Sequence, residues 1–373
     1  MKHKLLALLS LVIILYLAAC RANQQATPSP TVTDDSAVAG SLVVTPSSAP
    51  QLTQSDLSPT RSATAQTAKN VEYVGHIDGA SLAVVIQGNL MYLGIGHKLE
   101  VFEISDPASL RAVGKSEPLP GIVVDFIIVD GLAYVADDEA GMWIVDIVDP
   151  ANPTLSGFYS IPKYAVHDEV SELKYDDVAS MAVENGHAYV AEYQYGIRVV
   201  DISDPANPVE VGFYDTPGDA HGVVVVGEIA YVADFDQGLR VLNIADPAQP
   251  VEIGSYDTPG EAQSLTIAGE YVYVADGSDG MHVINIADPA HPVLAGSLDT
   301  SGYTQGVTIE GAYAYLADGS AGLVVVNIAD PANPVIAGAY DTPGYAWGVG
   351  VADEIVYVAD ANGGLAILRF VGE

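Results

Sequence analysis

Acidic side chains recur at a fixed position along this 373-residue chain, and they are the first residues whose type could do chemistry. Each lies three residues after a tyrosine, and the set is Asp137, Glu192, Asp234, Asp276, Asp318 and Asp360, with Ile95 at the first such position. Carboxylate oxygens are ligands that Ca²⁺ prefers, so the loops 234–238 and 276–280 could hold calcium. They lack the bidentate Glu of an EF-hand.

An acidic residue that recurs in nearly every repeat usually has a structural role within the repeat. We therefore expect each carboxylate to accept backbone N–H bonds within its own tight loop, where a glycine such as Gly238 supplies a left-handed backbone. This structural role is the main interpretation. No cofactor is expected, and calcium is the alternative.

A second set of residues precedes the same tyrosines and has the types that bind ligands. Ten residues before four consecutive tyrosines stand His221, Gln263, Gln305 and Trp347, and two positions earlier stand Asp177, Asp219, Glu261, Tyr303 and Tyr345. If the repeats form a ring, these residues make a half-ring around one end of its central channel. We expect a ligand site there, against the alternative of ordinary polar residues at a channel mouth.

One interval between tyrosines is 55 residues long, whereas the others are 42. The additional residues form a loop from about Pro162 to Asp177, which contains Tyr164 and His167. Loops that interrupt a regular repeat often carry function, so we place both residues in the candidate ligand site. A neutral surface insertion is the alternative.

Catalytic motifs are absent from the sequence. It has no Gly-x-Ser-x-Gly, no His-Glu-x-x-His and no phosphate-binding glycine loop. Many carboxylates share one expected face, so an acid and base pair for glycan chemistry stays open, but no particular pair stands out. The sequence therefore names no catalytic residue.

The elements that must position these residues are short strands. The tyrosine returns seven times, at Tyr92, Tyr134, Tyr189, Tyr231, Tyr273, Tyr315 and Tyr357. In the fourth copy, apolar runs at 220–226, 229–233, 239–244 and 251–256 are separated by turn residues. Four strands in a unit of 42 residues predict one blade of a β-propeller.

The ends of the repeat region predict how the ring closes. Residues 71–79 match the fourth strand of a repeat with nothing before it, and residues 345–350, 355–360 and 364–370 supply three strands before the chain stops. We predict an all-β, seven-bladed propeller of four-stranded antiparallel blades, closed by the N-terminal strand on the last blade. Asp-Pro pairs such as Asp246-Pro247 mark turns on the opposite face.

The third strand of each copy resembles the repeat of a known family. Met142-Trp143-Ile144-Val145-Asp146 and Ile197-Arg198-Val199-Val200-Asp201 are similar to the segment that names the LVIVD-repeat proteins, and several copies carry Asn in place of the final Asp. The resemblance implies a propeller-like, extracytoplasmic protein. It implies no catalytic residue.

The N-terminus has the pattern of a bacterial lipoprotein. Lys2 and Lys4 precede an apolar run from Leu5 to Leu17, which ends in Leu17-Ala18-Ala19-Cys20. This resembles a lipobox and implies cleavage before Cys20 and lipid attachment to its sulfur, against the alternative of a plain signal peptide. We predict a signal peptide at 1–19, a flexible stalk rich in Thr, Ser, Ala and Pro at 20–70, and the propeller at 71–373.

Composition limits the partners. The chain has 48 acidic and 13 basic residues, a formal net charge of −35, so its surface repels phosphate and we expect no nucleic acid partner. Membrane contact is expected through the lipid anchor only, and the protein is expected to be a monomer. The function expected is a lipid-anchored, extracytoplasmic binding or protein-interaction module for a surface protein or glycan. The alternative is an extracytoplasmic glycan hydrolase or lyase with its site at the channel mouth.

Overall fold

The structure is a computed structural model that describes residues 68–138, 141–160 and 178–372. The predicted signal peptide, Cys20 and nearly all of the predicted stalk lie outside the described residues, as do Tyr164 and His167. Within the described ranges there is no helix of the length and apolarity needed to cross a membrane.

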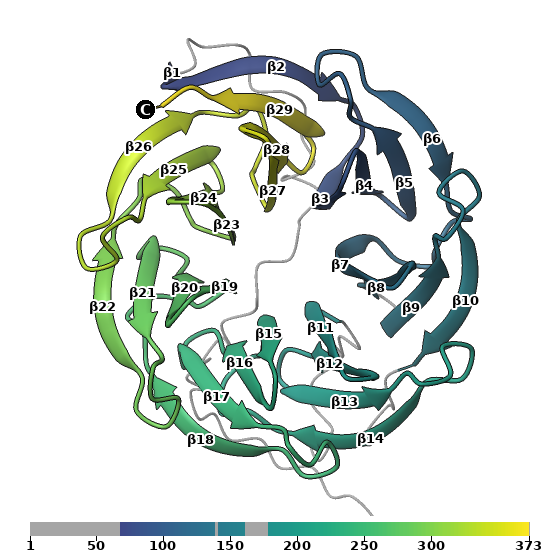
Figure 1. Ribbon diagram of the computed structural model, residues 1–373, viewed down its shortest axis with the longest axis vertical. Coiled ribbons are helices and arrows are strands. Elements are labelled where there is room, and N and C mark those ends of the chain that lie inside the picture. The colour runs from purple at the N-terminus through teal and green to yellow at the C-terminus, as the bar shows by residue number, and fades with distance from the viewer. Residues whose placement is uncertain (1–67, 139–140, 161–177, 373) are drawn as a thin grey trace, which may run out of the picture. The chain divides into compact units, whose positions relative to one another are not determined.

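The described residues form seven antiparallel sheets, six of four strands and one of five, arranged in a ring (Figure 1). Blade 1 is β3 (Ser81–Gln87), β4 (Leu90–Ile95), β5 (Lys98–Glu103) and β6 (Arg111–Lys115); blade 2 is β7 (Val123–Val129), β8 (Leu132–Asp137), β9 (Gly141–Asp146) and β10 (Thr154–Tyr159); blade 3 is β11 (Ser180–Glu184), β12 (His187–Ala191), β13 (Ile197–Asp201) and β14 (Val209–Tyr214). Blade 4 is β15 (Gly222–Val226), β16 (Ile229–Ala233), β17 (Leu239–Asn243) and β18 (Val251–Tyr256); blade 5 is β19 (Ser264–Ala268), β20 (Tyr271–Ala275), β21 (Met281–Asn285) and β22 (Val293–Leu298). Blade 6 is β23 (Gly306–Glu310), β24 (Tyr313–Ala317), β25 (Leu323–Asn327) and β26 (Val335–Tyr340); blade 7 is β27 (Gly348–Ala352), β28 (Ile355–Ala359), β29 (Leu365–Phe370) and β2 (Val71–Ile77).

Ring closure follows the prediction. Strand β2 pairs antiparallel with β29, with Val71 opposite Phe370 and Ile77 opposite Leu365, so the N-terminal strand completes blade 7. A two-residue strand, β1 (Ala68–Lys69), pairs with β26 on the outer edge of blade 6. It lies just before residue 71, where we expected the domain to begin. The predicted fold is confirmed.

The innermost strands begin slightly later than the apolar runs suggested. The run starts at residue 220 in blade 4 and at 345 in blade 7, yet β15 begins at Gly222 and β27 at Gly348. The reason is that Ala220 forms a bridge with Tyr193, and Ala346 forms one with Gly319, each across to a loop of the preceding blade. The first residues of each run therefore join two blades and do not extend the strand.

The hydrophobic core is divided into clusters that lie between neighbouring blades. In one of them Tyr231 and Val241 of blade 4 pack with Leu265 and Ile284 of blade 5. The repeated tyrosines are among the most buried residues, with exposed fractions from 1 to 4%. Each blade thus buries its apolar faces only against its neighbours, as in other repeat proteins.

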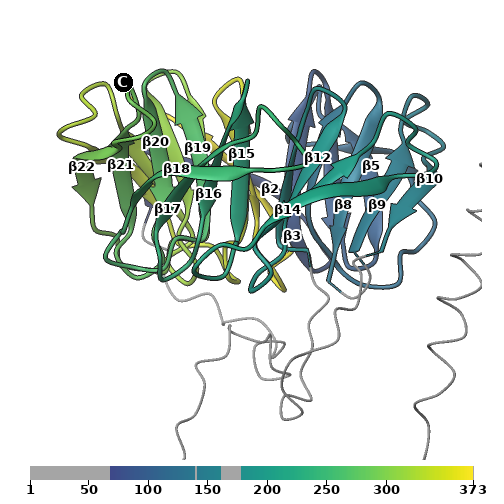
Figure 2. The ribbon, with the colours of Figure 1, turned by 90° about the horizontal axis from the view of Figure 1, so that it is seen from below.

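The Asp-Pro turns brace neighbouring blades on one face of the ring. Asp246 Oδ1 accepts the N–H of Ala248, and the Asp-Pro pair thus lies in a turn, as the sequence predicted. The turn of blade 5 lies against the outer strand of blade 4, where a Cβ on Gly254 would be only 2.4 Å from the carbonyl oxygen of Pro289. This close approach explains why a glycine stands there. The opposite face, which we call the mouth face, carries the acidic loops and the predicted half-ring; Figure 2 shows both faces edge-on.

Candidate functional site

The repeated carboxylates are buried on the mouth face and connect neighbouring blades. Asp137, Asp234, Asp276, Asp318 and Asp360 are fully buried, and each Oδ2 accepts the backbone N–H of a glycine 16 residues earlier. These glycines are Gly121, Gly218, Gly260, Gly302 and Gly344, in the connections that lead from one blade into the next. The structural role was predicted correctly, but the donors are not those of the acid's own loop.

In blade 5 a threonine hydroxyl completes the same arrangement. Thr258 Oγ1 donates to Asp276 Oδ1 at 2.5 Å, and Thr342 does the same for Asp360 in blade 7. The predicted loop glycines do have left-handed backbones, with φ of +70° at Gly238 and +71° at Gly280. These contacts occupy the oxygens that a calcium ion would need, and calcium binding stays a prediction.

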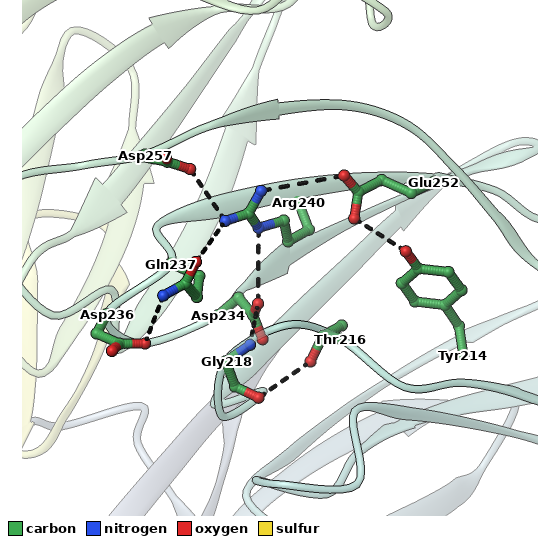
Figure 3. A network of polar contacts seen from close by, with 9 residues as sticks. All are labelled: Tyr214, Thr216, Gly218, Asp234, Asp236, Gln237, Arg240, Glu252 and Asp257. Atoms are coloured by element: carbon green, nitrogen blue, oxygen red, sulfur yellow. Dashed lines mark hydrogen bonds and ion pairs between the residues drawn. The ribbon is translucent and has the colours of Figure 1, made fainter.

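A buried guanidinium reaches the carboxylate of blade 4 (Figure 3). Arg240 Nε lies 3.6 Å from Asp234 Oδ2, and Arg240 Nη2 donates to Asp257 at 2.9 Å and to Gln237 at 3.2 Å. Burial nevertheless raises the pKa of Asp234 to about 6, although Arg240 and the donors from Thr216 and Gly218 oppose that shift. The network therefore holds a charge that the protein interior disfavours.

The predicted half-ring residues lie in the connections just before the innermost strands. His221 Nδ1 is 3.1 Å from Gln263 Oε1, and Gln263 Nε2 donates to the hydroxyl of Tyr303 at 2.9 Å. Gln305 Nε2 donates to the hydroxyl of Tyr345 at 3.3 Å, and the rings of Tyr345 and Trp347 are 5.8 Å apart. These contacts link six of the eight half-ring residues within the described ranges into two groups, one of His221, Gln263 and Tyr303 and one of Gln305, Tyr345 and Trp347. That they bind a ligand stays a prediction.

The protonation of His221 follows from these contacts. Gln263 Nε2 also donates to the backbone carbonyl of Glu261 at 3.3 Å, and a carbonyl only accepts, so the amide oxygen must face His221. Nδ1 therefore carries the proton. Burial lowers the pKa of His221 to about 4, so the ring is neutral at pH 7. Its Nε2 is then a bare acceptor, and within the described residues it has no hydrogen-bond partner.

Two aromatic residues that the sequence analysis did not select lie beside His221. The ring of Phe235 stacks on His221 at 4.8 Å, and the ring of Tyr193 meets it edge-on at 4.9 Å. Both residues have a left-handed backbone, with φ of +47° and +34°. Bulky residues rarely take that conformation, because the Cβ crowds the backbone.

The equivalent loop positions in blades 5 and 6 are Gly277 and Gly319, and tyrosines from the next connection cover them. A Cβ on Gly277 would lie 2.9 Å from Tyr303 Cζ, and one on Gly319 would lie 2.8 Å from Tyr345 Cζ. Four consecutive loops are therefore each accompanied by an aromatic ring, either their own or a neighbour's. We call the resulting set the aromatic arc: Tyr193, His221, Phe235, Tyr303, Tyr345 and Trp347.

The innermost strands of blades 2 to 6 line a cavity of about 420 Å³. Its lining comes from innermost strands and is mostly aliphatic, with Ser180, Ser264 and Thr308 among the polar residues. Asp125 of β7 also lines it, and burial raises its pKa to about 6. In the described ranges no group of three or more His, Cys, Asp or Glu residues is placed to hold a metal ion.

Comparison with known proteins supports the reading of the repeat. The sequence model described as LVIVD repeat matches residues 78–116, 120–160, 177–216, 217–258, 259–300, 301–342 and 343–368. A comparison with curated proteins finds no match. Among solved structures, the crystal structure of the computationally designed Ika8 protein is similar, with a TM-score of 0.57 and 10% identity over 80% of this chain and 98% of that chain. At that identity the likeness shows the fold alone.

Proposed function

This chain belongs to the LVIVD-repeat family, and from that premise we propose that it is a ligand-binding module whose site is the aromatic arc on the mouth face. The observation that carries the proposal is the backbone strain at Tyr193 and Phe235. Strained positions of this kind cluster at functional sites. The same loop position takes glycine in blades 5 and 6, so the fold itself does not require a large residue there.

Unsatisfied polar atoms give a second line of support. Within the described residues, His221 Nε2 and Trp347 Nε1 are both buried without a hydrogen-bond partner. One is an acceptor and the other is a donor, and each destabilises the folded protein as long as it has no hydrogen-bond partner. A ligand that offers both a donor and an acceptor would satisfy both atoms.

The cellular setting is part of the same proposal. The lipobox-like segment that ends at Cys20 supports a lipid-anchored, extracytoplasmic protein, and the Thr- and Ser-rich segment after it supports a stalk. A binding module at the end of a stalk would meet surface proteins or glycans. The net charge of −35 argues against nucleic acid as the ligand.

The test is binding of the full chain to glycan arrays and to cell-envelope fractions, with reaction products monitored in the same wells. Phe235→Gly removes the aromatic ring and also relieves the backbone strain. Its matched control is Ala361→Gly, because Ala361 occupies the same loop position in blade 7 with φ of +46°. We expect Phe235→Gly to weaken binding at least tenfold and Ala361→Gly to leave it unchanged.

Equal binding by the two variants, or an unchanged affinity after Trp347→Ala and His221→Ala, would remove the arc as the site. Formation of a hydrolysed or eliminated product would favour the glycan hydrolase or lyase instead. The search for a general acid and base would then begin among the carboxylates of the mouth face.

A further inference from the structure

The aromatic arc is bordered by carboxylates. Asp219 and Glu261 occupy the positions that Tyr303 and Tyr345 take in the next two connections. Asp236 directly follows Phe235 in its loop. We call Asp219, Asp236 and Glu261 the acidic edge.

Phe235 contacts the two connections that carry Asp219 and Glu261. Its own ring stacks on His221, two residues after Asp219. Its backbone bridges to Ala262, which directly follows Glu261. In the next blade Glu261 Oε2 lies 3.0 Å from where a Cβ on Gly277 would stand, and Tyr303 Cζ lies 2.9 Å from the same point. An aromatic ring and a carboxylate therefore approach the same point in the blade 5 loop, and in the blade 4 loop they belong to the adjacent residues Phe235 and Asp236.

Asp219 has no counter-charge among the described residues, where neither a hydrogen bond nor an ion pair reaches its carboxylate. Burial, and secondarily the charge of Asp236, raise the pKa of Asp219. The guanidinium on this part of the mouth face, Arg240, already contacts Asp234, Asp257 and Gln237. A half-buried carboxylate beside another carboxylate, without a cation, is an arrangement that an incoming positive charge would stabilise.

We infer that the ligand of the aromatic arc is an organic cation, a quaternary ammonium or protonated amine, whose charge lies against Phe235 and Tyr303 and is balanced by Asp219 and Glu261. The inference rests on the proposed binding function and names its ligand class. Aromatic faces attract such cations through the ring quadrupole. A calcium ion would need several converging oxygens and gains nothing from the rings. A neutral sugar could donate hydrogen bonds to the carboxylates but would leave their charge unbalanced, whereas a cation would balance it.

The neutral state of His221 fits the same ligand. A protonated imidazole next to Phe235 would repel a cation, but the pKa of His221 is lowered to about 4 by burial, so the ring carries no charge at pH 7. Its unpartnered Nε2 can accept a hydrogen bond from an N–H or O–H group of the ligand.

The experiment is calorimetric titration of the full chain with choline chloride at low ionic strength. In parallel, the protein is titrated with 3,3-dimethylbutan-1-ol, which has the same shape without the charge, and with calcium chloride. We expect saturable choline binding that is about tenfold tighter than binding of the uncharged alcohol, a ratio that corresponds to a cation–π contribution of usual size.

Three variants test where the positive charge of choline binds. Asp219→Asn should weaken choline binding about fivefold to tenfold and leave binding of the alcohol unchanged, and Phe235→Leu should weaken choline binding at least fivefold. The control is Asp299→Asn, an exposed acid on the mouth face that carries the same charge change and should alter choline affinity less than twofold. Unchanged melting temperatures show that the variants are folded.

The outcomes separate this inference from the proposed function. If choline does not bind but a neutral glycan binds and loses affinity in Phe235→Gly, the arc is a binding site and the cation class is wrong. Equal affinity for choline and the alcohol, or a calcium signal that disappears in Asp219→Asn, also overturns it. If no glycan, envelope fraction or cation binds, both proposals fail.

Discussion

Asp318 Oδ2 accepts a 3.0 Å hydrogen bond from the backbone N–H of Gly302, a residue of the connection that crosses from blade 5 into blade 6. Its other oxygen accepts hydrogen bonds from Thr300 at 2.6 Å and from Thr304 at 2.8 Å. One buried carboxylate therefore fixes the crossing between two blades. Similar contacts at Asp276 and Asp360 make this the regular device of the mouth face.

Removing that carboxylate should destabilise the ring. In Asp318→Ala, the donors of Thr300, Gly302 and Thr304 lose their acceptor, and we expect the free energy of unfolding to fall by about 2–4 kcal/mol. The midpoint of urea unfolding measures the change. The exposed Asp299 is the control, and Asp299→Ala should change the free energy by less than about 0.5 kcal/mol. Equal losses in the two variants would contradict the role given to Asp318.

Stability should increase as the pH is lowered from 7 to about 5. Burial raises the pKa of Asp125, Asp234 and Asp360 to about 6 from the ordinary value of 3.8. Between these values the folded protein binds protons that the unfolded chain does not, so the free energy of unfolding falls as pH rises through that window. Each group accounts for at most about 3 kcal/mol. His221 offsets part of this gain, because burial lowers its pKa to about 4 and the unfolded chain binds a proton there at a higher pH.

The matched variant is Asp125→Asn, which keeps an acceptor for the N–H of Phe126 and cannot ionise. We expect it to be more stable than the wild type at pH 7 and to gain less on acidification. Urea titrations at pH 5, 6 and 7 provide the comparison. An Asp125→Asn variant that gains as much stability on acidification as the wild type would show that the pKa of Asp125 is not raised.

Alanine substitutions at two glycines should destabilise the protein for different reasons. A Cβ on Gly254 would lie 2.4 Å from the carbonyl oxygen of Pro289, so Gly254→Ala forces two blades apart, and we expect a loss of about 1–3 kcal/mol. Gly227 has φ of +61° with no atom near its Cβ position, so Gly227→Ala should cost only about 1 kcal/mol of backbone strain. Thermal unfolding distinguishes them, and a larger loss at Gly227 would reverse our account of the blade contact.

Membrane attachment should depend on one sulfur. We expect the full chain to label with radioactive palmitate and to sediment with membranes, and Cys20→Ser to do neither, because Cys20 is the single cysteine of the chain. Growth with the label followed by fractionation is the measurement. A full chain that does not label would exclude lipidation at this sulfur, and a Cys20→Ser protein that labels as strongly as the full chain would place the lipid elsewhere.

The sequence was sufficient to predict the architecture because the same pattern of four strands recurs seven times. The spacing of Tyr231 and its equivalents fixed the blade, and the unmatched strand at residue 71 fixed the closure, which pairs Val71 with Phe370. The partners of Asp234 were predicted wrongly, because the glycine it binds is 16 residues away, across a connection whose path depends on the neighbouring blade.

The candidate site could be predicted only in part. His221 and Trp347 stood out because they break the repeat, but Tyr193 and Phe235 were overlooked. Their signal was present in the alignment of the copies, where the residue after the acid is Tyr193, Phe235, Gly277, Gly319 and Ala361. What the sequence could not give was the left-handed backbone at that position, which turns an ordinary aromatic residue into a strained one.

The pairing of β2 with β29 also means that blade 7 cannot be completed until the end of the chain has been synthesised. Val71 and Phe370 are about 300 residues apart, so at about 5–20 residues per second β2 leaves the ribosome roughly 15–60 seconds before its partner exists. During that interval β2 has no strand to pair with. Afterwards β27, β28 and β29 form an incomplete blade until β2 pairs with β29. Because β2 resembles every other outer strand, β2 of a neighbouring nascent chain can pair with β29 instead. We therefore expect overexpression at high level to yield oligomers in which the rings have exchanged β2.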